Sequence, residues 1–198
     1  MIPWSPDTSL IVVDVQNDFA DPAGSLSVTG GDAIIPLLNA QIAAARTAGA
    51  LVVYTQDWHP AHTPHFAADG GPWPVHCVMD TWGAALHPDL VLDGPIVRKG
   101  TNGEDGYSGF TMRDPMGETT VSTALAWLLR AHGVASVVVC GLATEYCVLA
   151  TALESGQLAP AGARGRRVVR LGGRRQRQHG PPSRGIARIR HWQQSYTS

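Results

Sequence analysis

Apolar runs that alternate with helical patterns constrain the fold of this chain most strongly. Residues 9–15, 50–55 and 134–141 are short runs rich in valine, leucine and isoleucine, typical of strands buried on both faces. Residues 32–48 have apolar side chains at helical spacing, and residues 144–155 follow the third run directly as a helix. This alternation predicts an α/β, three-layer fold with a central, mostly parallel sheet flanked by helices.

Two weaker elements complete the pattern. Residues 95–99 (PIVRK) predict a short strand, and residues 121–132 predict a helix with its leucines on one face and Gly133 at its end. Residues 56–93 are irregular, rich in proline, and contain five of the eight histidines. Because ligands bind beyond the carboxyl ends of parallel strands, the site is expected at that edge of the sheet.

Bulk composition points to a protein of the cytoplasm. Of the 198 residues, 44% are hydrophobic and 16% are charged, which is an ordinary globular balance. The three cysteines are widely spaced, which argues against a disulfide framework and for a reducing compartment. We see neither a signal peptide nor a run approaching the roughly 20 apolar residues of a membrane span. A cytoplasmic protein without membrane contact is therefore expected.

The charges are distributed unevenly along the chain. All 16 acidic residues lie at or before Glu154, together with five basic residues, so residues 1–155 carry a net charge of −11. Residues 156–198 contain ten arginines and no acid. We therefore expect a domain over residues 1–155 and a segment of aberrant composition over residues 156–198, whose place in that domain is in doubt.

Polar side chains lie at or just after the ends of the predicted strands. Cys147 lies in the first turn of a helix, where free N–H groups favour a thiolate, although an inert core cysteine is an equal alternative. Asp14 ends the first strand and could move protons, or it could cap a turn. Lys99, the only lysine, could support negative charge, or it could be an ordinary surface residue.

Histidines and aromatic residues gather in the irregular region. Asp57, His59, His65 and His76 are a ligand set suited to a divalent metal such as zinc, iron or manganese, and a histidine-rich surface loop is the alternative. His62 and His87 are spare candidates for the same site. Several aromatic residues could enclose a flat ring, or they could belong to the core; they are Phe19, Trp58, Trp73, Trp82 and Tyr107.

Six segments in order carry a family resemblance. They are DVQNDF (14–19), DWH (57–59), WPVHC (73–77), RKG (98–100), YSGF (107–110) and GLATEYCV (141–148). The series resembles nicotinamidases, which are cysteine amidohydrolases of the isochorismatase-like group. The resemblance implies that Asp14 is the general base, that Lys99 supports charge and that Cys147 is the nucleophile. It also implies a cis peptide before Ala143, with the backbone amides of Ala143 and Cys147 forming an oxyanion hole.

The resemblance further implies a metal centre, a pocket and a reaction. Asp57, His59, His65 and His76 match the metal ligands of the family, and the substrate pocket is lined at positions that match Phe19, Trp73 and Tyr107. The implied reaction converts nicotinamide to nicotinate and ammonia in NAD salvage, with pyrazinamide as a second substrate. A related hydrolase of another small amide is the nearest alternative.

The resemblance stops near Ser155, where the family continues with more of the sheet and a final helix. The arginine-rich composition beyond that point is expected when a G+C-rich gene is read out of frame, and we interpret residues 156–198 in that way. The alternative is a basic arm that binds nucleic acid, which would make the chain a binding protein or an inactive one. Oligomeric state stays open, with a homo-oligomer among the possibilities.

Overall fold

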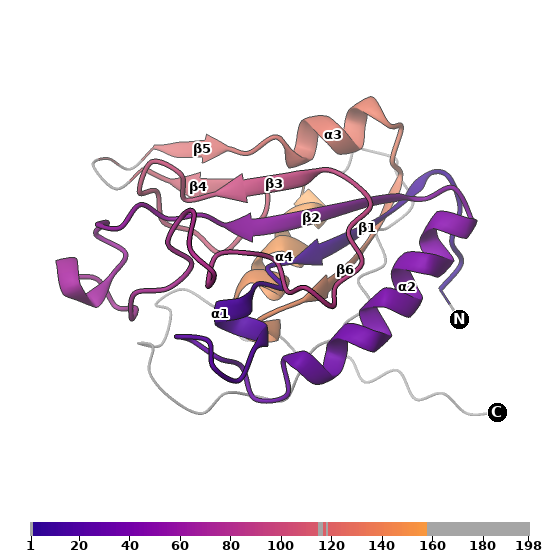
Figure 1. Cartoon of the computed structure of the whole chain (residues 1–198). Coiled ribbons are helices and arrows are strands. Elements are labelled where there is room, and N and C mark those ends of the chain that lie inside the picture. Colours follow the sequence, from indigo (N-terminus) through magenta and orange to yellow (C-terminus); the bar gives the residue numbers. More distant parts are fainter. Residues whose placement is uncertain (1, 115–116, 118, 158–198) are drawn as a thin grey trace.

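Four parallel strands form the central sheet of the computed structural model, which describes all residues except 1, 115–116, 118 and 158–198 (Figure 1). The strand order is β3-β2-β1-β6. The strands are β1 (Thr8–Val13), β2 (Leu51–Asp57), β3 (Ile96–Lys99) and β6 (Ser136–Gly141). The predicted parallel sheet is therefore confirmed.

The middle strand β1 shows why the apolar runs are continuous. All six of its residues are buried, and it pairs in parallel with β2 on one side and with β6 on the other. Leu10 and Val12 pack into one hydrophobic core, whereas Ile11 and Val13 pack into another. A strand covered on both faces needs apolar side chains at every position, and so it shows no polar alternation.

Helices cover both faces of this sheet (Figure 1). Helix α2 (Ile35–Thr47) follows a 3-10 turn at Asp32–Ile34 and buries its apolar residues in the first core. Helices α3 (Leu125–Ala131) and α4 (Leu149–Gln157) pack in the second core. The predicted three-layer fold is confirmed. The short segments α1 (Asn17–Ala20) and η2 (Ala67–Asp69) lie in the connections.

The predicted start of the helix at 121 was wrong. Residues Thr120–Ser122 form β5, which pairs antiparallel with β4 (Thr111–Arg113), and the helix begins only at Leu125. Residues 119–123 contain four β-branched side chains, which restrict the side-chain rotamers available in a helix and favour a strand. The Thr123 hydroxyl then accepts a hydrogen bond from the Leu125 N–H at 3.1 Å and so caps the entry to α3.

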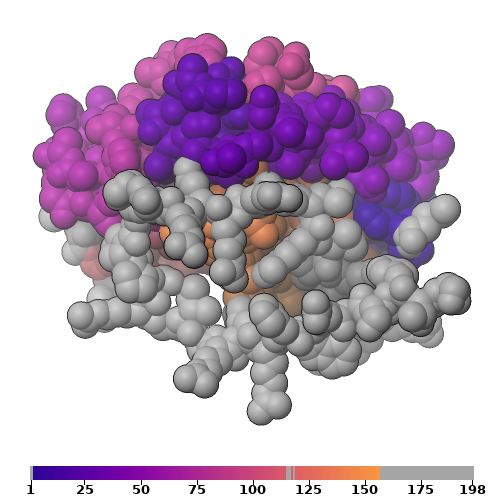
Figure 2. Space-filling model, turned by 90° about the horizontal axis from the view of Figure 1, so that it is seen from below, coloured from indigo at the N-terminus to yellow at the C-terminus, as the bar shows by residue number. Residues whose placement is uncertain are grey.

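Figure 2 shows the molecule from below, with the purple atoms of the N-terminal part above the orange atoms near residue 150. Apart from residues 156–157 at the end of α4, the arginine-rich segment predicted to be aberrant lies outside the described residues. Within the part of the chain that the structure describes, no helix is long and apolar enough to cross a membrane.

Packing of α2 on the sheet can be tested with two adjacent leucines. Leu38 is fully buried against the sheet, whereas Leu37 is 59% exposed. We expect Leu38→Ala to lower the free energy of unfolding by about 2–5 kcal/mol because it leaves a cavity. Leu37→Ala should change it by less than about 0.5 kcal/mol. Urea denaturation measures both, and equal effects would contradict the proposed packing.

Candidate active site

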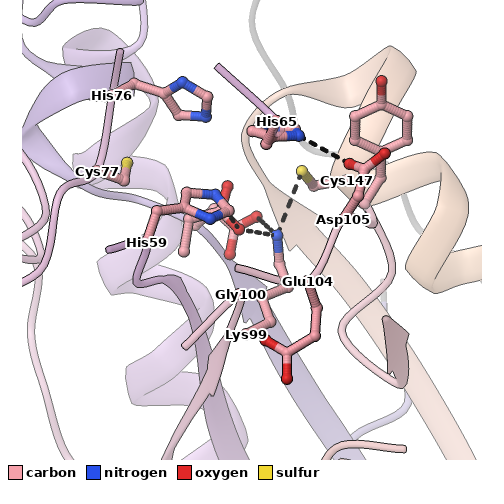
Figure 3. A network of polar contacts seen from close by, with 12 residues as sticks. His59, His65, His76, Cys77, Lys99, Gly100, Glu104, Asp105 and Cys147 are labelled. Carbon is pink, nitrogen blue, oxygen red and sulfur yellow. Dashed lines mark hydrogen bonds and ion pairs between the residues drawn. The ribbon is translucent and has the colours of Figure 1, made fainter. Parts of the chain in front are cut away.

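Four side chains that lie at or after the ends of four strands converge at the carboxyl edge of the sheet. Figure 3 shows two of them, Lys99 and Cys147, pointing toward each other. Asp14 follows β1, Asp57 ends β2, Lys99 ends β3, and Cys147 lies in the turn after β6. Asp57 and Lys99 are directly paired in the sheet register. All four residues are buried, so the structure brings together the strand-end residues that the sequence singled out.

Lys99 lies at the centre of this group. Its Nζ is 3.0 Å from Asp14 Oδ2, is hydrogen bonded to Asp57 Oδ1, and lies 3.7 Å from the Cys147 sulfur. Burial by itself would lower the pKa of the lysine, but the two carboxylates outweigh it and raise that pKa well above its usual value. The ammonium group therefore stays charged and acts as a fixed positive charge beside the thiol.

Asp14 is held in a specific orientation next to Lys99. Its φ angle is 50°, in a left-handed region that few residues with a Cβ adopt. The Thr55 hydroxyl donates a hydrogen bond of 2.6 Å to Asp14 Oδ1. Burial raises the pKa of Asp14, and the charge of Lys99 only partly opposes that effect. A carboxylate of raised pKa is well suited to take up and return a proton.

Cys147 sits in a π-helical turn, Thr144–Val148, that follows β6 and precedes α4. Burial raises the pKa of the thiol well above its usual value, and the lowering by Lys99 does not compensate. A carboxylate oxygen of Asp14 lies within 4.8 Å of the Cys147 sulfur, so Asp14 is placed to receive the thiol proton.

The backbone before Cys147 has two unusual features. The peptide bond between Leu142 and Ala143 is cis, as the resemblance implied. Gly141 has a φ of 120°, and a Cβ there would overlap the carbonyl oxygen of Val13. A glycine at this position allows β6 to approach β1 closely, which brings the turn with Cys147 over Asp14.

Three buried histidines form a second cluster beside the first. One ring nitrogen each of His59, His65 and His76 lies within 4.8 Å of the other two. Burial lowers the pKa of His59 to about 4 and also lowers that of His76. Neutral imidazoles are the form that binds a metal.

Polar contacts of Nδ1 indicate which nitrogen two of these rings present. His76 Nδ1 donates to the carbonyl of Pro74 at 2.7 Å, and His65 Nδ1 lies 2.8 Å from Asp105 Oδ1. Both rings therefore keep Nε2 as the free ligand atom. Neither nitrogen of the buried His59 has a hydrogen-bond partner among the described residues. Such unsatisfied donor atoms fit a divalent metal ion.

Asp57 joins the two clusters. Besides its hydrogen bond to Lys99, its Oδ1 lies 3.9 Å from His59 Nε2. Burial would raise its pKa, but Lys99 and the histidines lower it to about 2, so the side chain is a carboxylate. The spare candidates lie elsewhere: the His62 side chain is 86% exposed beside Asp69, and His87 lies 4.0 Å from Asp21.

A pocket opens onto both clusters. Phe19, Trp73 and Tyr107 line it, and the Trp73 indole N–H donates to the Tyr107 hydroxyl at 3.2 Å. Trp58 instead stacks against Arg98, and Trp82 is 54% exposed. The full lining is Phe19, Leu26, Val28, Asp57, His65, Trp73, His76, Gly106, Tyr107, Ala143, Tyr146 and Cys147.

Two residues that support the site, Gln16 and Asp18, were not predicted from the sequence. The buried side chain of Gln16 donates to the Asp57 carbonyl at 2.7 Å and accepts from the Asp57 N–H at 2.8 Å. Asp18 accepts hydrogen bonds from the N–H groups of Ser25 and Cys77, and so holds the segment next to His76. Both lie within the DVQNDF segment, but no feature of the sequence indicated what they contact.

Comparison with known proteins agrees with this geometry. The family model described as "Isochorismatase domain" matches residues 8–158. The chain belongs to this isochorismatase family. Among its relatives, the nicotinamidase of Acinetobacter baylyi is 40% identical over 168 residues, which cover 75% of this chain and 74% of that protein.

Solved structures of this family show the same fold. The pyrazinamidase of Pyrococcus horikoshii in complex with zinc has a TM-score of 0.69 and 46% identity, covering 78% of this chain and 80% of that chain. PnC1 from L. infantum in complex with nicotinate has a TM-score of 0.74 and 39% identity, covering 86% and 81%. The family resemblance inferred from the six segments is thus confirmed.

The buried charges can be tested by removing Lys99. In Lys99→Met two buried carboxylates lose their cation, and we expect the free energy of unfolding to fall by about 3–5 kcal/mol. Arg46→Met is the control, because Arg46 pairs with Asp93 at the exposed surface and should contribute at most about 1 kcal/mol. Thermal or urea unfolding measures both, and similar small losses would show that the buried ion pairs are not needed.

The histidine cluster can be tested by measuring bound metal. We expect His76→Ala to lower zinc content after dialysis against limiting zinc, because one of three converging imidazoles is lost. His62→Ala removes an exposed histidine of the same loop and should retain the zinc of the unaltered protein. Elemental analysis of the purified proteins gives both values. Equal zinc in the two variants would rule out His76 as a ligand.

Proposed function

We propose that this chain is a metal-dependent amidohydrolase that converts nicotinamide to nicotinate and ammonia, as a step of NAD salvage, and that it also hydrolyses pyrazinamide. The observation that carries this proposal is a buried thiol that lines a pocket together with His65 and His76, next to the buried ammonium group of Lys99 and the Asp14 carboxylate. The similarity to nicotinamidases and to structures that contain zinc or nicotinate supports this assignment.

In the first half of the proposed reaction, Cys147 is the nucleophile. Asp14 takes the thiol proton while the sulfur bonds to the amide carbon, since the thiol alone is a weak acid in this site. Negative charge then develops on the amide oxygen, where the backbone N–H groups of Ala143 and Cys147 would stabilise it. The protonated Asp14 gives its proton to the nitrogen, ammonia leaves and a thioester remains.

In the second half, water cleaves the thioester. Asp14 accepts one proton from the water as the oxygen bonds to the acyl carbon, and this proton returns to the Cys147 sulfur as the C–S bond breaks. The product leaves as nicotinic acid, which gives its remaining proton to the released ammonia or to solvent and becomes nicotinate. Lys99 remains charged throughout and stabilises the negative charge that moves between the sulfur and Asp14. Each group is thereby restored for another cycle.

His59, His65, His76 and Asp57 would hold the metal, and zinc, iron and manganese all suit this donor set. When bound, the ion would supply a Lewis acid for the ring nitrogen of the substrate. Phe19, Trp73 and Tyr107 would enclose the flat ring between apolar surfaces. The position of the aromatic residues beside the histidines supports a small planar amide as the substrate.

We further propose that the catalytic domain is residues 1–155 and that residues 156–198 come from a shifted reading frame. The confinement of all acidic residues to positions up to Glu154 supports this proposal. Sequencing the gene and finding an uninterrupted frame would contradict it, and salt-dependent nucleic-acid binding would favour a basic arm. The three free cysteines support a reducing cytoplasm as the place of action.

Release of ammonia from nicotinamide tests the proposed function. We expect the purified protein with zinc to release ammonia and nicotinate, and Cys147→Ala to lower kcat/KM by roughly 10³-fold or more because the nucleophile is lost. Cys140→Ala is the matched control, since Cys140 is buried in β6 and does not line the pocket. Folded, zinc-loaded protein that leaves nicotinamide intact but hydrolyses another small amide would favour the alternative substrate.

A further inference from the structure

The carboxylate of Asp105, to which the proposed reaction assigns no role, faces a histidine of the cluster (Figure 3). Its Oδ1 lies 2.8 Å from His65 Nδ1. We propose that Asp105 is a positioning residue of the metal centre, which fixes His65 with Nε2 directed to the ion and strengthens that nitrogen as a ligand. This inference rests on the metal centre of the proposed function.

The chemistry of the two groups determines which atom of this 2.8 Å contact carries the hydrogen. An ionised carboxylate can only accept, so His65 Nδ1 must carry the hydrogen, and the lone pair is left on Nε2. A carboxylate that accepts this hydrogen also makes the imidazole more electron-rich, and thus a better ligand. Asp105 therefore sets both the tautomer and the ligand strength of His65.

The loop of Asp105 is held firmly enough to orient another side chain. Its backbone N–H donates to the Arg113 carbonyl at 2.9 Å, and its carbonyl accepts from the Arg113 N–H at 2.6 Å, next to β4. The two loops are also tied together, because the Thr63 hydroxyl donates to the Gly103 carbonyl at 3.0 Å and accepts from the His65 N–H. The carboxylate and the imidazole are thus anchored to the same framework.

The three histidines differ in the group that their imidazole nitrogens contact. His76 donates to the neutral carbonyl of Pro74, and His59 has no hydrogen-bond partner among the described residues. Of the three rings, His65 is the one whose Nδ1 faces a carboxylate in the described part of the chain. His65 is nearly enclosed, with 5% of its side chain exposed, whereas the side chain of Asp105 reaches it from the surface and is 45% exposed.

Zinc binding to the metal-free protein tests the proposal without any substrate. The dissociation constant is measured at fixed pH in competition with a chromophoric chelator. We expect Asp105→Ala to weaken zinc binding by roughly 10–100-fold. Asp105→Asn keeps an oxygen that can accept from His65, and it should therefore retain part of the affinity. Asp93→Ala is the matched control, since Asp93 is similarly exposed but pairs with Arg46 away from the site.

The outcomes separate this inference from the proposed function. Equal zinc affinity in Asp105→Ala and Asp93→Ala would overturn the positioning role, as would equal losses in Asp105→Ala and Asp105→Asn. The urea midpoint of metal-free Asp105→Ala should match that of Asp93→Ala, and a large drop would overturn the proposal by assigning the loss to folding. If the unaltered protein bound no zinc, the metal centre itself would be refuted, and this inference with it.

Discussion

The ion pairs between one buried lysine and two buried carboxylates are the interaction on which the rest of this site depends. Lys99 is 1% exposed and would be costly to bury without partners, yet Asp57 contacts it from the adjacent strand β2 and Asp14 from the end of β1, one strand further along the sheet. The parallel sheet provides this arrangement, because consecutive carboxyl ends lie side by side at one edge. The same ammonium group then lies beside the thiol of Cys147, where charge changes during the proposed reaction.

Asp57 connects the cluster around Lys99 to the cluster of three histidines. Its carboxylate contacts Lys99 on one side and lies near His59 on the other, while Gln16 holds its backbone through two hydrogen bonds. A substrate in the pocket would therefore be held by one cluster and react at the other. The distance between the clusters is set by β2, whose last residue is Asp57 and whose continuation carries His59. The separation of the two clusters thus follows from the fold.

Much of the fold and of the candidate site could be predicted from the sequence. The features that could not be predicted have physical explanations. The strands were recognisable because residues buried on both faces are apolar without alternation, and the strand-end position of Asp14, Lys99 and Cys147 follows from parallel topology. The start of α3 was misplaced because leucine spacing outweighed the β-branched residues around Val121. The burial of Cys147 and the contact between Asp105 and His65 depend on long-range packing, which sequence spacing does not encode.

Trapping the acyl group tests most directly whether Cys147, Asp14 and Lys99 act through a thioester. Nicotinamide and methyl nicotinate would be hydrolysed in the presence of hydroxylamine, and the ratio of hydroxamate to nicotinate measured for each. Because both substrates would give the same thioester on Cys147, the account predicts the same ratio for both, with no hydroxamate from Cys147→Ala. A ratio that depends on the leaving group, or turnover without hydroxamate, would contradict the covalent mechanism.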